Sequence, residues 1–205
     1  MGKIEYLIYG GGAQSRVVTS ILEKMDIRIA GIFDKNNDLK TSKQIPFLGN
    51  YDTQIHSKCK LVIAIGDNKI RKKVSQIIQH PIATIIDPNT NISKDVSIGE
   101  GSQIIMSSTI NIGTRIGKYC IVNTNSSIDH DCIISDFAHI APGVTICGGV
   151  SIGNSTLVGA GSTVLPNVTI GDNVIIGAGS LVNKNIPSGK KVLGTPAKVI
   201  YNEKK

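Results

Sequence analysis

Residues 92–115, which read ISKDVS-IGEGSQ-IIMSST-INIGTR, set a six-residue period that decides the fold. Ile or Val opens every hexad from Ile92 to Val182, at sixteen consecutive positions without an insertion. The residue four places further on is mostly small or β-branched, and Gly, Asn, Asp and Pro fill the positions between. A helix would repeat its apolar residues about every 3.6 positions and a strand about every 2, so neither explains this spacing.

The hexad period predicts a parallel β-helix, because fixed six-residue repeats are a signature of that architecture. Each hexad would supply a short extended segment and a turn, with its aliphatic residue in the interior and its backbone paired to the neighbouring coils. Gly and Asn would supply the positive φ that tight corners need. We therefore predict an all-β helix over residues 86–187, and a tail over residues 188–205 that caps its open end.

Residues 1–85 have a different pattern, typical of the first half of a Rossmann-like α/β unit. A strand is predicted over 3–9, a turn at Gly10-Gly11-Gly12, a helix over 16–25 and a strand over 27–33 that ends at Asp34. A third strand over 60–65 leads into a helix over 70–79. A glycine-rich turn before a helix can bind an anion, although a purely structural turn remains an alternative. Since only about 80 residues precede the repeats, a single nucleotide is expected rather than a dinucleotide.

The composition is that of an ordinary globular protein, with 40% hydrophobic and 18% charged residues. No segment is long and apolar enough to span a bilayer and no signal peptide is evident, so a cytoplasmic protein without membrane insertion is expected. The four cysteines form no CxxC pair, and those at interior repeat positions are expected to be reduced core residues. The net charge of +7 suits a nucleotide or coenzyme A, whereas scattered lysines and few aromatics argue against nucleic acid. His56 and His80 are expected on the surface.

Three segments resemble one branch of the hexapeptide-repeat transferases, the NeuD/PglD-type acetyltransferases of bacterial surface-sugar pathways. They are Tyr9–Gly12 with Phe33-Asp34, Ala64–Asn68 with Arg71, and Asp129–Cys132 with Phe137–Gly143. The tail sequence GTPAK, residues 194–198, is shared with hexapeptide acyltransferases more widely. The resemblance implies a left-handed helix of about five coils, each made of three hexads. It also implies acetyl-CoA as co-substrate and a homotrimer with acetyl-CoA bound between adjacent helices.

The chain departs from this branch at two positions. The glycine-rich turn has Gln14 where the branch usually has His, which changes a contact near the nucleotide. Asp131 stands where some members have Glu, one methylene longer.

The sequence around His130 suggests general-base chemistry. In the hexad that begins at Ile128, His130 takes the third position, which faces out of the helix, between Asp129 and Asp131. An imidazole has a pKa of about 6.5, which suits a base near neutral pH, and a carboxylate can fix its tautomer. The resemblance implies His130 as general base and Asp131 as its orienting acid. On the residues alone, a turn histidine with solvated neighbours remains open.

Further site residues are implied by the resemblance. His139 would donate a hydrogen bond toward the thioester carbonyl, with a bystander role as the alternative, and two glycines would let the pantetheine arm approach the backbone. The set expected at acetyl-CoA is His139, Gly148, Gly149, Gly161, Gly177, Ala178, Lys184 and Lys198. The set expected at the nucleotide sugar is Gly10, Gly11, Gly12, Gln14, Asp34, Ile65, Gly66, Asn68 and Arg71. No metal is expected, because gamma-class carbonic anhydrases bind zinc on this kind of helix through three histidines, and the repeats contain only two.

The resemblance implies an acetyl-CoA-dependent acetyltransferase that modifies the 4-amino group of a UDP-linked amino-deoxy sugar in surface glycan biosynthesis. One alternative is O-acetylation of sialic acid or CMP-sialic acid by the same base. Another, from a different class, is a non-catalytic trimer that binds a sugar nucleotide, in which replacement of His130 would change no rate.

Overall fold

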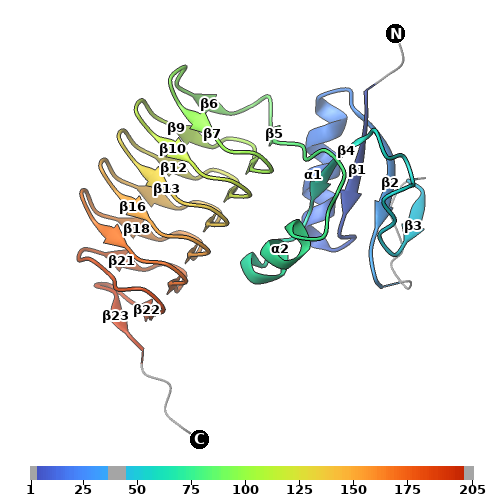
Figure 1. Cartoon of the computed structure of the whole chain (residues 1–205). Helices are drawn as coiled ribbons and strands as arrows, with labels where there is room; N and C mark the ends of the chain where they lie inside the picture. The colour runs from blue at the N-terminus through green and yellow to red at the C-terminus, as the bar shows by residue number, and fades with distance from the viewer. Residues whose placement is uncertain (1–3, 37–44, 201–205) are drawn as a thin grey trace, which may run out of the picture. The chain divides into compact units, whose positions relative to one another are not determined.

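The computed structural model describes residues 4–36 and 45–200. The chain divides into two compact units, Met1–Pro88 and Asn89–Lys205. The first is an α/β unit and the second is a stack of coils, as Figure 1 shows. Within the described ranges, no helix is long and apolar enough to cross a membrane.

The first unit contains a parallel sheet whose strand order is β3-β2-β1-β4. Its central strand β1 buries Leu7 and Ile8, which point to opposite faces, as expected for a parallel sheet covered on both sides. Helix α1 packs through Val18, Ile21 and Leu22, an apolar stripe at helical spacing. The elements are β1 (Glu5–Tyr9), α1 (Ala13–Lys24), β2 (Arg28–Phe33), β3 (Phe47–Gly49), β4 (Lys60–Ile63), α2 (Asn68–Ser75) and β5 (Ile85–Ile86).

The Rossmann-like prediction for this unit is confirmed, with shifted boundaries. Helix α2 begins at Asn68 rather than at residue 70, because the Asp67 side chain accepts a hydrogen bond from the Ile70 N–H at 2.8 Å and caps the helix. The helix ends at Ser75, four residues earlier than predicted.

The expectation that His80 lies on the surface is wrong. Its side chain is buried, and its Nε2 lies 3.0 Å from the Ile55 carbonyl oxygen. The Tyr51 hydroxyl accepts hydrogen bonds from the N–H groups of Gln79 and His80, so its own hydrogen points to His80 Nδ1, 2.8 Å away. The sequence offered no signal for this pair, since tyrosine and histidine lie about 30 residues apart in an irregular segment.

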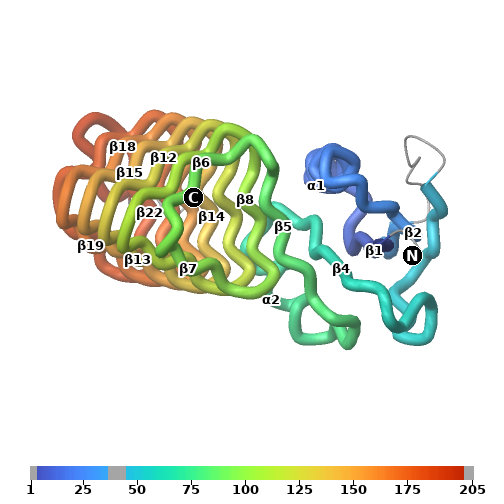
Figure 2. The backbone as a smooth tube through the Cα atoms, turned by 90° about the horizontal axis from the view of Figure 1, so that it is seen from above, coloured from blue at the N-terminus to red at the C-terminus, as the bar shows by residue number. Residues whose placement is uncertain are grey.

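The second unit is a parallel β-helix, as predicted. Strands of two residues pair in register with strands 18 residues further along, for example Arg115 with Ile133 and Ile121 with His139. Figure 2 shows the successive coils stacked along this unit, from green to red. Its strands are β6 (Asn91–Ile92), β7 (Ser97–Ile98), β8 (Gln103–Ile104), β9 (Thr109–Ile110), β10 (Arg115–Ile116), β11 (Ile121–Val122), β12 (Ser127–Ile128), β13 (Ile133–Ile134), β14 (His139–Ile140), β15 (Thr145–Ile146), β16 (Ser151–Ile152), β17 (Leu157–Val158), β18 (Thr163–Val164), β19 (Thr169–Ile170), β20 (Ile175–Ile176), β21 (Leu181–Val182), β22 (Lys191–Leu193) and β23 (Lys198–Val199).

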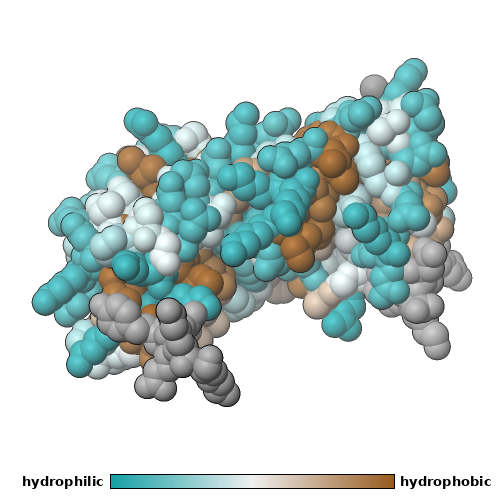
Figure 3. Space-filling model, turned by 60° about the horizontal axis from the view of Figure 1, so that its bottom comes forward, coloured by the Kyte–Doolittle hydropathy of each residue, from teal (hydrophilic) through white to brown (hydrophobic). Residues whose placement is uncertain are grey.

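The hexad aliphatics form the interior ladder. From Ile104 to Val182, every one of them is buried. The small positions Cys120 and Cys132 are fully buried beside them, and their thiols donate to the carbonyls of Ser135 and Cys147 in turn. Burial of each aliphatic side chain contributes about 1.5–3 kcal/mol relative to exposure. On the face of the molecule drawn in Figure 3, many hydrophilic residues lie on the surface, interspersed with hydrophobic patches.

The chain leaves the hexad phase after Val182. Strand β22 still pairs in parallel with β20, but Ile175 now faces Lys191, only 16 residues further on. Strand β23 then turns back and pairs antiparallel with β22, through Val192 and Val199. This pairing occupies backbone groups at one edge of the final coil, which would otherwise be open to another strand. Residues 201–205 of the expected tail lie outside the described residues.

Candidate functional site

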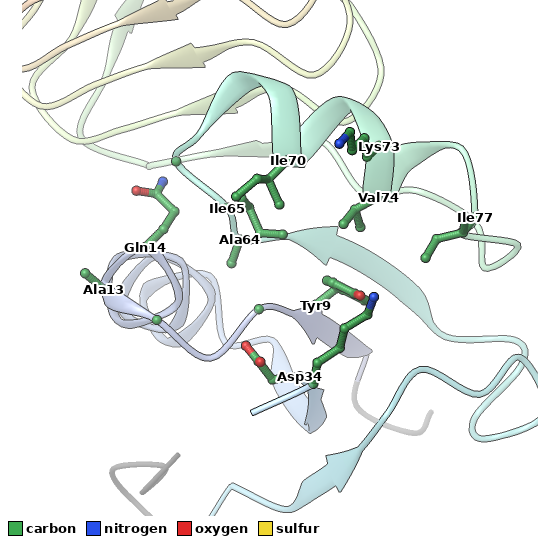
Figure 4. A pocket seen from close by; sticks show the side chains of 14 residues that line it. Tyr9, Ala13, Gln14, Asp34, Ala64, Ile65, Ile70, Lys73, Val74 and Ile77 are labelled. Atoms are coloured by element: carbon green, nitrogen blue, oxygen red, sulfur yellow. The ribbon is translucent and has the colours of Figure 1, made fainter. Parts of the chain in front are cut away.

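The first unit contains a pocket of about 730 Å³ at the carboxyl ends of its strands. Six of the nine residues predicted at the nucleotide sugar line it, namely Gly10, Gly12, Gln14, Asp34, Ile65 and Gly66. Figure 4 shows Gln14 on α1, Asp34 after β2, and Ile65 after β4. Carboxyl ends of parallel strands are where open α/β sheets bind ligands. The pocket therefore lies at the residues where the sequence predicts a nucleotide site.

Two hydrogen bonds to the end of the neighbouring strand β2 and the residue after it hold the glycine-rich turn in place. The Gly10 N–H donates to the Phe33 carbonyl at 2.8 Å, and the Gly11 N–H donates to Asp34 Oδ2 at 2.6 Å. Gly10 has a φ of +99°, and a Cβ there would lie 3.0 Å from the Ala64 carbonyl oxygen, so glycine is required on both counts. Because the Gly11 N–H is engaged with Asp34, the part of this turn that could hold an anion is the start of α1 at Gly12 and Ala13, which line the pocket.

Arg71 lies behind the pocket wall rather than in it. Its side chain is 0% exposed, and its guanidinium donates to the carbonyls of Ile65 and Gly66 at 3.0 Å each. It also donates to Asn68 Oδ1 at 2.7 Å. The predicted direct contact with substrate is therefore corrected: Arg71 acts on the pocket by holding the loop after β4, because a fully buried guanidinium has no surface to offer a ligand.

Sequence reasoning missed the apolar side of this pocket. Ile70, Val74 and Ile77 point from α2 and the turn after it into the cavity, beside Lys73 (Figure 4). The signal was present in the sequence, as apolar residues at i, i+4 and i+7 whose outer members are half exposed. The opposite wall includes Tyr9, where burial and then the Asp34 charge raise the pKa of the phenol. An apolar wall with a few charged groups suits the nucleobase and the phosphates of a nucleotide.

On the β-helix, His130 and Asp131 form a hydrogen-bonded pair at one corner. His130 Nδ1 lies 2.8 Å from Asp131 Oδ2, with 55% and 72% of the two side chains exposed. Asp131 has a φ of +58°, a left-handed conformation that Asp tolerates better than most residues. This bond leaves Nε2 as the ring nitrogen able to act on a ligand.

The electrostatic surroundings favour protonation of this imidazole. The hydrogen bond to Asp131 raises the pKa of His130 above its ordinary value, and the charge of Asp129 adds to the effect. Asp129 itself is held by Asn111 Nδ2 at 2.9 Å and by the His130 N–H at 2.8 Å, which lower the pKa of its carboxyl. The hydrogen bond to Asp131 and the charge of Asp129 therefore both stabilise an imidazolium at position 130.

The glycines predicted at acetyl-CoA differ in the space around them. The His130 ring covers Gly148, where a Cβ would lie 2.5 Å from Nε2, so this glycine accommodates the imidazole rather than leaving open backbone. Gly149 is covered in the same way by Asn167, and Gly177 by Leu193. Only Gly161 of this predicted set has no neighbouring atom within 4 Å of a built Cβ. Ala178, Lys184 and Lys198 are exposed.

His139 has a partner that the sequence did not suggest. Asn123 Oδ1 accepts the Thr124 N–H at 2.8 Å, so the amide turns its Nδ2 toward His139 Nε2, 3.1 Å away. Because an amide NH₂ can only donate, Nε2 is the acceptor and the imidazole hydrogen is on Nδ1. Asn123 lies 16 residues before His139, on the preceding coil, a relation visible only once the coil length of 18 is known. In this tautomer the ring nitrogen that can donate a hydrogen bond is Nδ1.

Each of the two units contains a segment that matches a known protein family. The family model of the PglD N-terminal domain matches residues 5–78, and that of the bacterial transferase hexapeptide (six repeats) matches residues 149–184. Among curated proteins, GDP-perosamine N-acetyltransferase of Escherichia coli O157:H7 is 37% identical over 101 residues, which are 48% of this chain. The matched segment covers 46% of that enzyme, so this chain spans about half of its length.

Solved structures align over nearly the whole chain. PerB from Caulobacter crescentus, in complex with CoA and GDP-perosamine, has 31% sequence identity and a TM-score of 0.90, with 98% of each chain covered. The acetyltransferase domain of PglB from Neisseria gonorrhoeae FA1090 has 26% identity and a TM-score of 0.89, covering 96% of this chain and 99% of that one. A second structure of that domain is a complex with acetyl coenzyme A.

Proposed function

Because this chain belongs to the NeuD/PglD-type acetyltransferases of the hexapeptide-repeat superfamily, we propose that it transfers an acetyl group from acetyl-CoA to the amino group of a nucleotide-linked amino-deoxy sugar. The observation that carries the proposal is the exposed His130–Asp131 pair, with Nδ1 and Oδ2 2.8 Å apart. An imidazole whose second nitrogen is tied to a carboxylate is the arrangement that acyl transfer uses for its base. The product would serve bacterial surface glycan biosynthesis, as the family resemblance implies.

In the proposed reaction the two histidines have different roles. The sugar amine attacks the thioester carbonyl carbon, and His130 Nε2 takes the proton that the nitrogen loses as the new C–N bond forms. Asp131 and Asp129 stabilise the imidazolium. His139 Nδ1–H donates to the carbonyl oxygen as it gains negative charge. When the C–S bond breaks, the imidazolium returns its proton to the CoA thiolate, so His130 is neutral again for the next turnover.

The two substrates are assigned to different parts of the chain. The pocket in the first unit would hold the nucleotide, with phosphates at the start of α1 near Gly12 and the base against the apolar wall of α2. Acetyl-CoA would lie on the β-helix, where Gly161 leaves open backbone and Lys184 and Lys198 offer cations for its phosphates. Acetyl-CoA supplies the activated acyl group as a co-substrate.

We further propose that the enzyme is a cytoplasmic homotrimer with acetyl-CoA bound between adjacent helices. Support comes from the family resemblance. Light scattering of the purified protein would give the mass of three chains of 21.7 kDa each. A monomeric mass that persists with acetyl-CoA and full activity would contradict the trimer.

The nucleotide of the acceptor has two candidates. The relatives at 30–37% identity act on or bind GDP-perosamine, which favours a GDP-linked sugar. The UDP-linked 4-amino sugar, which the sequence resemblance implies, is the second candidate. Both candidates carry an amine on a deoxy sugar, so His130 could act as general base toward either amine.

Release of free CoA thiol tests the proposal. Wild type and His130→Ala are assayed with acetyl-CoA and, in separate reactions, GDP-perosamine, the UDP-linked 4-amino-4,6-dideoxy sugar, and sialic acid. We expect turnover of one amino sugar and its loss in the variant. Turnover of sialic acid alone would replace N-acetylation by O-acetylation. No turnover, together with sugar-nucleotide binding that His130→Ala leaves unchanged, would make the protein a binding trimer.

A further inference from the structure

The corner that carries Asp131 alternates between a polar side chain and glycine from one coil to the next. Residues 18 apart in this column are Asp95, Gly113, Asp131, Gly149 and Asn167. Asp131 leans back over Gly113, and a Cβ at Gly113 would lie 2.4 Å from Asp131 Oδ1. Since ordinary contacts of a Cβ begin near 3.4 Å, an added methyl group would have to displace this oxygen by about 1 Å.

Backbone conformation alone does not explain glycine at this position. Gly113 has a φ of +73°, which favours glycine, yet the same corner holds Asp131 at +58° and Asn167 at +60°. The corner therefore accepts a side chain in two of its coils. What distinguishes Gly113 is the carboxylate lying directly over it.

Asp131 cannot move away as part of its backbone, because the coil containing Gly113 holds it on both sides. The Asp131 N–H donates to the Ile112 carbonyl at 3.0 Å. Thr114 Oγ1 donates to the Asp129 carbonyl at 2.7 Å and accepts the Cys132 N–H at 3.1 Å. A methyl group at position 113 would therefore be accommodated by rotation of the carboxylate, and rotation breaks its 2.8 Å bond to His130 Nδ1.

From this geometry we propose that Gly113 is a positioning residue for the proposed general base: its missing side chain leaves the space in which Asp131 meets His130. Gly148 has the matching role one coil later, beneath the imidazole ring. The inference rests on the proposed function for its kinetic effect, while the hydrogen bond itself can be measured without turnover.

The test compares Gly113→Ala with a matched control, Gly189→Ala. Gly189 has a φ of +74°, and nothing lies within 4 Å of a Cβ built there, so the control introduces the same left-handed strain without the clash. Asp131→Gly removes the carboxylate at a corner where glycine fits, and the double variant Gly113→Ala/Asp131→Gly has no clash. The pKa of each histidine is followed by NMR, with His130 assigned from its absence in His130→Ala.

We expect the pKa of His130 to fall toward the ordinary value in Gly113→Ala, in Asp131→Gly and in the double variant, and to stay raised in Gly189→Ala. With the acceptor identified, kcat of Gly113→Ala should fall about a hundredfold with KM little changed, the scale of a 1 Å misplacement. The double variant should be no slower than Asp131→Gly, because the methyl group then has nothing to displace.

Three results would overturn the inference. They are an unchanged pKa of His130 in Gly113→Ala, a double variant slower than Asp131→Gly, and a Gly113→Ala chain that fails to fold both with and without Asp131 while Gly189→Ala folds. If Gly113→Ala folds only once Asp131 is removed, the clash is supported. If wild type transfers no acetyl group at all, the proposed function fails, and the NMR titration still decides the role of Gly113.

Discussion

His130 Nδ1 lies 2.8 Å from Asp131 Oδ2, although neighbouring residues of an extended chain point to opposite sides. The contact exists because Asp131 has left-handed backbone geometry, with φ of +58°, which swings its side chain back toward the preceding residue. A corner of the β-helix therefore joins base and acid from two consecutive positions, without a second segment of chain.

This bond makes the rate depend on pH in a definite direction. A general base must be neutral, so kcat/KM should rise with pH through the pKa of His130, which Asp131 raises. Asp131→Asn keeps the shape of the side chain and removes its charge, and asparagine tolerates a positive φ. The acid limb of the pH profile should then shift to lower pH, while the plateau falls because the tautomer is no longer fixed. Asp172→Asn, at another corner, should leave the limb in place. A limb that moves to higher pH would contradict this role of Asp131.

Asn123 should matter for the rate more than for binding. Its Nδ2 fixes His139 with the hydrogen on Nδ1, so Asn123→Ala frees the ring to present the wrong nitrogen. Loss of one oriented hydrogen bond in the transition state corresponds to about a tenfold lower kcat. The check is steady-state kinetics with both substrates, and KM for acetyl-CoA should change little.

Asn154→Ala is the control for that variant, because Asn154 also donates across coils, but to the carboxylate of Asp172, at 3.2 Å, rather than to a histidine. Equal loss in the two asparagine variants would show a general effect on the helix instead of an effect on His139.

The positions of many residues in this site could be predicted, because they follow from local sequence patterns. The phase of the hexads placed His130 outward and the cysteines inward, and β-strand and turn patterns placed Gly10 and Asp34 at one sheet edge. What the sequence could not show were contacts between coils and behind the pocket wall. The Asn123–His139 pair depends on stacking, and the burial of Arg71 depends on how the loop after β4 folds around it. His80 was misplaced for the same reason, since its partner Tyr51 belongs to an irregular segment.

Lys73 should contribute to nucleotide affinity through charge. It lines the pocket, whereas Lys69 on the same helix does not. Lys73→Ala should raise the Kd of the sugar nucleotide about threefold to tenfold, corresponding to a charge-assisted contact of about 1 kcal/mol. The loss should shrink as salt is added, because an exposed charge is screened. Calorimetric titrations at two salt concentrations would measure both effects. A Lys69→Ala variant with the same loss would mean that net charge, rather than position, governs binding.

Arg71 should be needed for the pocket without touching the ligand. Arg71→Met keeps an apolar stem but removes the three donors that hold the carbonyls of Ile65 and Gly66 and the side chain of Asn68. We expect the free energy of unfolding of the first unit to fall by about 1–3 kcal/mol. The Kd of the sugar nucleotide should rise at least about tenfold, because the loop that lines the pocket is no longer fixed.

Thermal unfolding and equilibrium binding of Arg71→Met would be compared with Lys72→Met, which changes the neighbouring, exposed charge by the same amount. If Arg71→Met retained wild-type affinity while losing stability, the loop after β4 would be held by other contacts, and Arg71 would belong to the core alone. If it lost affinity at unchanged stability, a direct contact with the ligand would have to form on binding. Only a loss of both stability and affinity supports the proposal that the Arg71 guanidinium holds the loop that lines the pocket.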